Sequence, residues 1–380
     1  MQIDPLRALL GGKTPRQFLS THWQKKPMLV RAALPQFRGL IEPRALMQLA
    51  CDEQVEARVV VRSGSRWQVL HGPFRPAVFR RLGQRGWTLL VQDLNHHVAG
   101  AHELLRAFRF IPNARLDDVM VSYAPPGGGV GPHVDSYDVF LLQGPGQRRW
   151  RIGRQRDLRL VEGAPLKLLQ HFQPAREYVL EAGDMLYLPP SYAHEGTAVT
   201  ACTTYSIGFR APAWKELTTQ FLAYLQDHIE RTGMYADPNL RPTKTPGKLG
   251  KDMLDQAWAQ VQRIRWTRAD VTRFMGCYLT EPKPTVFFVP PQAPLSHTAF
   301  VRKAWQRGVS LDPKSRMLYN GTEIFLNGEP EHLDRGTARH LRTLADCGSL
   351  RPAPALRDSL SDPLYAWYRA GFLHLVTHPT

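Results

Sequence analysis

Two residues that can hold a metal ion stand two positions apart at the end of a glycine-rich stretch. Residues 127–135 read Gly-Gly-Gly-Val-Gly-Pro-His-Val-Asp and end in His133 and Asp135. Side chains at positions i and i+2 of an extended strand point to the same face, so the imidazole and the carboxylate would converge. A second imidazole would complete a two-histidine, one-carboxylate triad. That ligand set leaves coordination positions open and is diagnostic of non-haem Fe(II) oxygenases.

The second imidazole is predicted at His194. Gly183-Asp184 forms a turn, residues 185–188 form a strand, and Pro189-Pro190 ends it, so that His194 begins the next strand. The segment between Asp135 and His194 is long enough for the strands that would bring the two ends together. A lone histidine is more often structural than a ligand. The combination with His133 and Asp135 favours the metal site.

Such a triad leaves room for a bidentate co-substrate and for O2. A 2-oxoglutarate co-substrate needs a cation for its distal carboxylate, and arginine suits that bidentate pairing. Arg148, on the strand after the Gly144-Pro145-Gly146 turn, is the candidate. The other arginines between 149 and 159 form a solvated or RNA-facing edge in the alternative interpretation. Ser122 could donate its hydroxyl to the same carboxylate, and an ordinary strand position is the alternative for it.

The elements that must position these residues are mostly short strands. Strands are predicted at 57–62, 66–70, 87–91, 119–124, 138–143, 148–153, 177–180, 185–188 and 203–209. Short strands at regular spacing, separated by Gly/Pro turns, are typical of a β-sandwich or barrel, here of the jelly-roll kind. The periodicity then changes to that of helices, predicted at 213–231, 251–265 and 268–277.

The fold class is therefore α+β, with a double-stranded β-helix followed by helices and a C-terminal module. We predict a catalytic domain over 1–211 (core about 100–211), a helical region over 212–281 and a C-terminal domain over 282–380. The last begins at a Pro-rich linker. An Asn320-Gly321 hairpin signal and the helix predicted at 337–346 suggest a winged helix there. The helical region could be an oligomer interface or could simply pack.

The amino-acid composition limits which partners and which cellular compartment the chain can have. The net charge of +16 suggests a polyanion such as ribosomal RNA, although a basic, arginine-rich surface without a specific site is the equal alternative. Four scattered cysteines form no CxxC pair, which favours a reducing cytoplasm. No stretch of eighteen apolar residues predicts a membrane span, and no signal peptide is recognised.

Several motifs together resemble one known family. They are His-Trp-Gln-Lys-Lys-Pro (22–27), Trp-Gln-Val-Leu-His-Gly-Pro-Phe (67–74), the glycine loop extended over 125–140, Gly-Pro-Gly-Gln-Arg-Arg-Trp (144–150) and the run around His194. They resemble the bacterial ribosomal oxygenases of the Jumonji-C (JmjC) type. The resemblance implies an Fe(II)- and 2-oxoglutarate-dependent enzyme that hydroxylates an arginine of a large-subunit (50S) ribosomal protein. It implies iron ligation by His133, Asp135 and His194, 2-oxoglutarate binding by Arg148, a homodimer through the helical region, and a C-terminal winged helix.

An arginine substrate requires an anionic or hydroxyl-bearing pocket. Asp117 and Asp118, placed just before the strand at 119–124, are the acidic candidates for substrate binding, with Asp118 preferred, and Tyr137 could line the wall. An exposed loop acid is the alternative for Asp118. The alternative functions are a histidyl hydroxylase of another ribosomal protein and a histone-type demethylase. A non-catalytic ribosome- or RNA-binding protein with a structural metal, and a cupin isomerase or small-molecule dioxygenase, also remain open.

Overall fold

The computed structural model describes residues 5–229 and 232–376, which form two compact units. The first comprises Met1–Ala211, Pro282–Ser315 and Asp346–Thr380, and the second comprises Pro212–Glu281 and Arg316–Ala345. The helix predicted over 213–231 ends in residues that lie outside the described part of the chain.

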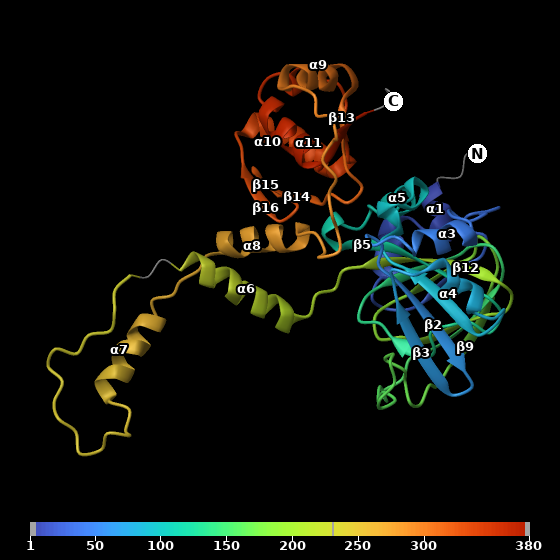
Figure 1. Cartoon of the computed structure of the whole chain (residues 1–380), viewed down its shortest axis with the longest axis horizontal. Helices are drawn as coiled ribbons and strands as arrows, with labels where there is room; N and C mark the ends of the chain where they lie inside the picture. The colour runs from blue at the N-terminus through green and yellow to red at the C-terminus, as the bar shows by residue number, and fades with distance from the viewer. Residues whose placement is uncertain (1–4, 230–231, 377–380) are drawn as a thin grey trace. The chain divides into compact units, whose positions relative to one another are not determined.

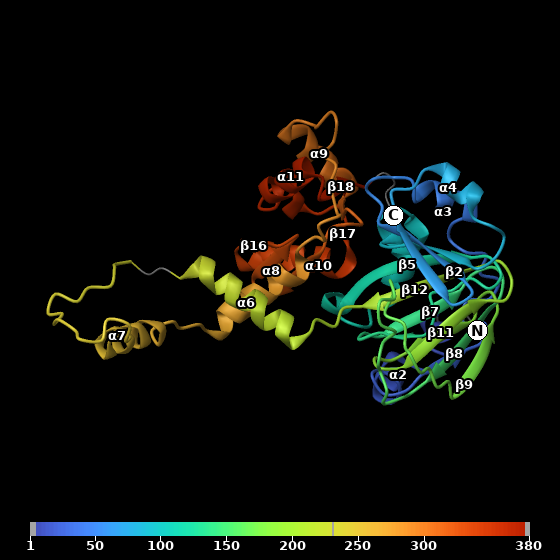
Figure 2. The same ribbon diagram turned by 60° about the horizontal axis from the view of Figure 1, so that its bottom comes forward.

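Two antiparallel β-sheets form the body of the first unit, the blue-to-green part of Figure 1. The larger sheet has the order β1-β10-β7-β12-β5-β4-β2-β3 and the smaller one β6-β11-β8-β9. Figure 2 shows strands of both sheets within this one body. The strands are β1 (Met28–Val30), β2 (Ala57–Ser63), β3 (Arg66–His71), β4 (Trp87–Val91), β5 (Leu116–Ala124), β6 (His133–Val134), β7 (Val139–Gln143), β8 (Arg148–Gly153), β9 (Arg176–Leu180), β10 (Met185–Leu188), β11 (Ala193–Ala198) and β12 (Cys202–Phe209).

Alternation along the strands gives the larger sheet two apolar faces. On β7, Phe140 and Leu142 join the core under the helices, whereas Val139 and Leu141 join a second core with Trp150 of the smaller sheet. Because neighbouring residues of a strand face opposite ways, one face packs on helices and the other faces the interior of the jelly roll. Full burial of a large apolar side chain stabilises by about 1.5–3 kcal/mol, which fixes the register.

Helices cover the outer face of the larger sheet. Thr14 begins α2 with a capping box in which its hydroxyl accepts from the Gln17 N–H and the Gln17 side chain accepts from the Thr14 N–H. Phe18 of this helix is fully buried in the core. The helices of this part are α1 (Pro5–Leu9), α2 (Pro15–Thr21), α3 (Pro43–Leu49), α4 (Pro76–Arg81), α5 (Ala99–Arg106), η1 (Leu94–His96) and η2 (Asn113–Arg115).

The remainder of the first unit is a small helix-and-sheet module from the C-terminal region. Its sheet has the order β17-β13-β18. The elements are α9 (His297–Arg307), β13 (Val309–Leu311), β17 (Ser349–Leu350), η3 (Pro354–Leu356), α11 (Ser361–Ala370) and β18 (Leu373–Leu375).

The second unit consists of helices and a three-stranded meander. Its α8 packs against the sheet β14-β15-β16 (Figure 1). Gly276 allows this close packing, since a Cβ there would lie 2.4 Å from the Phe325 ring. The elements are α6 (Trp214–His228), α7 (Lys251–Val261), α8 (Arg268–Thr280), β14 (Met317–Asn320), β15 (Glu323–Leu326) and β16 (Glu329–His332). Helix α10 (Arg335–Cys347) begins in this unit and ends in the other.

The jelly-roll strands were predicted closely, but some boundaries were wrong in a way that matters for function. Strand β5 begins at Leu116, so Asp117 and Asp118 lie within the strand and not before it. Strand β6 has only two residues, so Asp135 lies just beyond it. The Asn320-Gly321 hairpin joins β14 to β15 as predicted. Strands β13, β16, β17 and β18 were missed because each is very short or lacks alternation. The division into 1–211, 212–281 and 282–380 stays a prediction.

Across the described residues, 5–229 and 232–376, every helix is too short or too polar to cross a lipid bilayer.

Candidate metal centre and its surroundings

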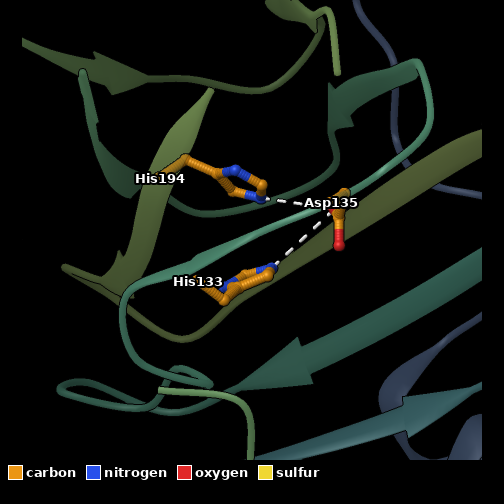
Figure 3. A group of neighbouring side chains, drawn as sticks. All are labelled: His133, Asp135 and His194. Atoms are coloured by element: carbon orange, nitrogen blue, oxygen red, sulfur yellow. Dashed lines mark ion pairs between the residues drawn. The ribbon is translucent and has the colours of Figure 1, made fainter. Parts of the chain in front are cut away.

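His133, Asp135 and His194 converge on one point. The Nε2 atoms of His194 and His133 lie 3.5 and 3.9 Å from Asp135 Oδ2, and the two ring centroids are 4.2 Å apart. Potential ligand atoms of all three residues lie within 4.8 Å of one another. Figure 3 shows both imidazoles directed toward the carboxylate. The convergence follows from the antiparallel pairing of β6 with β11, which places His194 directly opposite His133.

Backbone carbonyls fix the tautomer of both histidines. His133 Nδ1 lies 3.0 Å from the Gly131 carbonyl oxygen, and His194 Nδ1 lies 3.0 Å from that of Tyr192. A carbonyl oxygen can only accept, so both Nδ1 atoms carry the proton and donate. In its neutral form, each imidazole then presents the lone pair of Nε2 toward Asp135, which is the arrangement that metal-ligating histidines show.

His194 is the most enclosed of the three candidate ligands. Its side chain is 3% exposed, against 24% for His133 and 22% for Asp135. Burial, followed by the nearby His133, lowers the pKa of His194 to about 4. The imidazole is therefore neutral at physiological pH and available as a ligand.

The glycine loop brings the backbone close to neighbouring strands. A Cβ on Gly129 would lie 2.4 Å from the Gly196 carbonyl oxygen of β11. Gly131 has φ +77°, and a Cβ there would lie 2.5 Å from Leu168. Only glycine tolerates both the left-handed backbone and this approach, and the Gly131 carbonyl then orients His133. The loop is thus part of the ligand geometry.

Arg148 is buried on the same face of the smaller sheet as His194. In the β8–β11 pairing, Arg148 is opposite Ala198 and Ile152 is opposite His194, so alternation places Arg148 and His194 on one face. The residue is 4% exposed, and its Nε and Nη2 atoms find no hydrogen-bond acceptor among the described residues. A buried guanidinium with unpaired donors requires an anion, since an uncompensated buried charge is strongly destabilising.

The other arginines between 149 and 159 are paired with carboxylates or exposed to solvent. Arg149 pairs with Glu177 at 3.2 Å, and Arg151 pairs with Glu195. Arg159 pairs with Asp157, while Arg154 and Arg156 are exposed. Only Arg148 of this set points inward. The sequence could have indicated this, because Arg148 shares its strand face with the apolar Trp150 and Ile152 at positions i+2 and i+4.

Ser122 lies on the inward face of the larger sheet. Ala124, two residues further along β5, packs with Ala198, the cross-strand neighbour of Arg148. Ser122 is buried, and its Oγ lies 3.5 Å from the Thr204 carbonyl oxygen, a marginal hydrogen bond. Its hydroxyl can therefore turn toward another acceptor.

Thr88 is a residue that was missed in the sequence. It is fully buried on β4 and its Oγ1 has no hydrogen-bond partner among the described residues. Trp87 and Leu89, its neighbours, face the outer core, so Thr88 faces inward. The strand at 87–91 was predicted, but an apolar run of this kind does not reveal which face it presents.

Asp118 is buried, contrary to the exposed-loop alternative. It is 5% exposed, and its Oδ2 accepts from the Asp93 backbone N–H at 3.0 Å. Tyr137, in contrast, is 40% exposed. Desolvation of its hydroxyl, followed by the charges of Asp135, Asp118 and Asp117, raises the pKa of Tyr137. Tyr137 therefore lies within the electrostatic reach of both the triad and the acidic pair.

Comparisons with known proteins agree with this geometry. The family model "JmjC domain" matches residues 103–217, and "ROXA-like winged helix" matches residues 263–374. The chain is 34% identical to the ribosomal protein uL16 3-hydroxylase of Escherichia coli over 92% of each chain. It is 40% identical to a probable ribosomal oxygenase of Haemophilus influenzae over 60% of this chain and 55% of that one. A solved ribosomal oxygenase of Escherichia coli in complex with cobalt and 2-oxoglutarate superposes with a TM-score of 0.80 and 32% identity, over 94% of this chain and 97% of that one.

Proposed function

Because the chain belongs to the JmjC-type ribosomal oxygenases, we propose that it hydroxylates an arginine side chain of a large-subunit ribosomal protein. The family and the fold predicted from the sequence, a JmjC jelly roll with a C-terminal winged helix, are confirmed. The chain is a 2-oxoglutarate-dependent oxygenase with an iron cofactor. The observation that carries the proposed mechanism is the buried Arg148 guanidinium, unpaired and on the same face as His194.

The described residues fit both the metal and the co-substrate. Two imidazoles and one carboxylate offer ligand atoms within 4.8 Å of one another, a donor set suited to Fe(II). Arg148 offers donors for the distal carboxylate of 2-oxoglutarate, and Ser122 and Thr88 offer hydroxyl groups on the facing sheet. Iron, when bound with 2-oxoglutarate and O2, supplies the oxidation of an unactivated C–H bond.

The protein's own residues orient the metal ligands and bind the co-substrate. Backbone carbonyls of Gly131 and Tyr192 hold the imidazoles in the ligating tautomer. Arg148 would hold the distal carboxylate of 2-oxoglutarate. Trp150 and Leu141, which are buried in the interior of the jelly roll, would limit the access of water to it. Positioning of this kind is the main contribution a protein makes to cofactor chemistry.

Asp118 and Tyr137 are proposed to bind the substrate side chain. A carboxylate pairs well with a guanidinium, and Asp118 accepts only one hydrogen bond among the described residues, through Oδ2. Asp117 is engaged with Arg210 at 3.4 Å and with Lys283 at 3.4 Å, so Asp118 is the better candidate. The exposed ring of Tyr137 could pack against the apolar part of the arginine.

The proposed function is tested by intact-mass comparison of ribosomal proteins from the source cell, treated with the enzyme, Fe(II) and 2-oxoglutarate. One large-subunit protein is expected to gain the mass of one oxygen atom, localised to arginine by fragmentation. Localisation to histidine would favour the histidyl hydroxylase. Absence of any gain, with 2-oxoglutarate also unconsumed, would favour a non-catalytic binding protein.

We expect Asp118→Asn to raise KM for the substrate protein by about 10-fold to 100-fold, because a hydrogen bond to a charged group contributes about 1.5–3 kcal/mol. Slow, uncoupled turnover of 2-oxoglutarate should persist, since Asp118 does not touch the triad. Steady-state kinetics measure both. Asp52→Asn, at an exposed carboxylate that caps Gln54, is the matched control. An unchanged KM in Asp118→Asn would remove the acid from the substrate site.

The helices of the second unit are proposed to form a homodimer interface. They expose large apolar side chains: Trp214, Leu222, Met253, Leu254, Trp258, Val261 and Trp266. Side chains of α6 and the segment 261–266 line a groove of about 550 Å³. Exposed apolar surface of this kind marks an interaction site, and a second copy offers the same helices to fill the groove by two-fold symmetry.

Trp258→Glu is expected to convert the dimer to a monomer, because a charge would be buried in the apolar interface. Trp258 is 64% exposed in the single chain, so the monomer should remain folded. Sedimentation velocity measures the mass. Trp305→Glu, at a half-exposed tryptophan of α9, is the control and should not change it. A monomeric unsubstituted protein would refute the interface.

The basic surface is proposed to contact ribosomal RNA near the substrate. Arg154, Arg156 and Arg176 are exposed and make no ion pair among the described residues. Together with the net charge of +16, they favour a polyanionic neighbour. We also propose a cytoplasmic location, because the proposed substrate is a ribosomal protein.

A further inference from the structure

We propose that Lys283, on the segment that begins at Pro282, controls the charge of the Asp118 carboxylate and thereby the affinity of the site for a cationic substrate side chain. The inference rests on the proposed function of Asp118 as the group that binds the guanidinium. It assigns a positioning role to a residue far from Asp118 in the chain, and it does not alter the roles of the triad or of Arg148.

Lys283 is paired with two carboxylates that neighbour Asp118. Its Nζ lies 2.9 and 3.2 Å from the two oxygens of Asp93 and 3.4 Å from Asp117 Oδ1. Its side chain is 27% exposed and that of Asp93 is 8% exposed, so solvent screens this pair less than a surface pair. Desolvation opposes a charged lysine here, but the charges of Asp118, Asp117 and Asp93 raise the pKa of Lys283 above its ordinary value. The ammonium is therefore paired with Asp93 and Asp117 and lies within the electrostatic reach of Asp118.

The backbone at Asp93 links Lys283 directly to Asp118. Asp93 adopts a left-handed conformation with φ +50°, and its N–H donates to Asp118 Oδ2 while its carboxylate holds Lys283. Asp and Asn tolerate that conformation better than most residues do. Asp93 thus orients the Asp118 carboxylate with its main chain and holds the Lys283 ammonium with its side chain.

The other oxygen of Asp118 is not engaged by the described residues. Oδ1 accepts no hydrogen bond within the described ranges of the chain, and the position facing it on β12 is Gly208. A Cβ on Gly208 would lie 3.3 Å from this oxygen. The glycine therefore leaves room beside Oδ1 for a donor group from outside the protein.

The acidic cluster around Asp118 carries one more negative charge than positive charge when all its carboxylates are ionised. Three carboxylates, Asp93, Asp117 and Asp118, face two cations, Lys283 and the Arg210 that pairs with Asp117. Burial, followed by the charge of Asp93, raises the pKa of Asp118 to about 7, while Lys283 opposes the rise. A guanidinium would complete the balance only when Asp118 is ionised. Binding is therefore lost as pH falls through this pKa, and Lys283 determines where that happens.

Substitutions of opposite sign test the proposal. In the full-length protein loaded with diamagnetic Zn(II), the 13C chemical shift of the Asp118 carboxyl, assigned by its absence in Asp118→Asn, reports its pKa. We expect Lys283→Met to raise that pKa by about 1 or more, and Asp93→Asn to lower it, since each removes one nearby charge. Lys283→Arg should retain the unsubstituted value.

The matched control is Lys314→Met, because Lys314 lies on the same segment and its Nζ bonds the Phe287 carbonyl, not a carboxylate. It should leave the Asp118 pKa unchanged. An Asp118 pKa that moves in the same direction in Lys283→Met and Asp93→Asn, or in neither, overturns the proposal. If Lys283→Met does not fold, Lys283→Gln takes its place, and an unchanged Asp118 pKa in that variant overturns the proposal.

Kinetics separate this inference from the proposed function. The acidic limb of kcat/KM for the substrate protein should follow the measured Asp118 pKa, moving up in Lys283→Met and down in Asp93→Asn. At pH 7, KM in Lys283→Met should rise by about fivefold to tenfold if the pKa of Asp118 rises by about 1, because the ionised fraction falls in that proportion. If the pKa moves as expected but KM does not follow pH, Asp118 does not bind the substrate, and the control by Lys283 stands.

Discussion

His133→Ala should abolish hydroxylation while leaving the fold intact. His133 provides one of three candidate ligands, and its ring is one-quarter exposed at the edge of a two-residue strand, so its removal leaves no buried cavity. Loss of groups that merely orient a metal ligand typically reduces affinity or activity 10-fold to 100-fold. Loss of a ligand itself is therefore expected to reduce turnover by more than about 100-fold. Succinate formation and bound iron per chain measure the two effects.

The control is His71→Ala, at an exposed histidine of the same unit. It should retain both turnover and iron. His133→Ala should keep the thermal unfolding midpoint of the metal-free protein, because the loss concerns the metal and not the core. Unchanged turnover in His133→Ala would refute the assignment of the triad. Loss of turnover with full iron content would shift His133 to another role at the site.

The triad could be predicted because its signals are local. His133 and Asp135 are two residues apart, and the turn and the two prolines before His194 mark the start of its strand. The pairing of β6 with β11, which places His133 opposite His194, could not be predicted because the two strands are far apart in the sequence. Most strand positions were also predictable, since alternation reflects the two apolar faces of the larger sheet.

The acidic cluster could not be predicted, because its partners are remote. Asp117-Asp118 reads locally as a turn or exposed loop, and consecutive acids are unfavourable inside a strand. Arg210 and Lys283 compensate them in the folded chain, the latter from a segment about 170 residues further along. Such pairs leave no periodic trace in the sequence. Thr88 was missed for a related reason, since only the packing of Trp87 and Leu89 shows which way it faces.

Arg148→Met is the second substitution with a large expected effect. Truncating one partner of a buried, hydrogen-bonded charge pair costs about 2–5 kcal/mol of binding free energy. The KM for 2-oxoglutarate should therefore rise roughly 30-fold or more. Arg148→Lys should lose less, because lysine keeps the charge but not the bidentate donors. Kinetics and calorimetric titration of 2-oxoglutarate into the Co(II)-loaded protein measure the change. Arg149→Met, on the outer face and paired with Glu177, is the matched control.

Arg148→Met, which should weaken the binding of 2-oxoglutarate, should not lower the stability of the protein when 2-oxoglutarate is absent. Without 2-oxoglutarate, the Nε and Nη2 donors of Arg148 are buried and unpaired. Replacing a buried charge by an apolar side chain of similar size is often neutral or stabilising. Arg148→Met should therefore unfold at the same temperature as the unsubstituted protein or a higher one when 2-oxoglutarate is absent. Added 2-oxoglutarate should raise the midpoint only of the unsubstituted protein. A lower midpoint in Arg148→Met without 2-oxoglutarate would mean that the guanidinium is structural, and an equal ligand-induced rise in both proteins would place the co-substrate elsewhere.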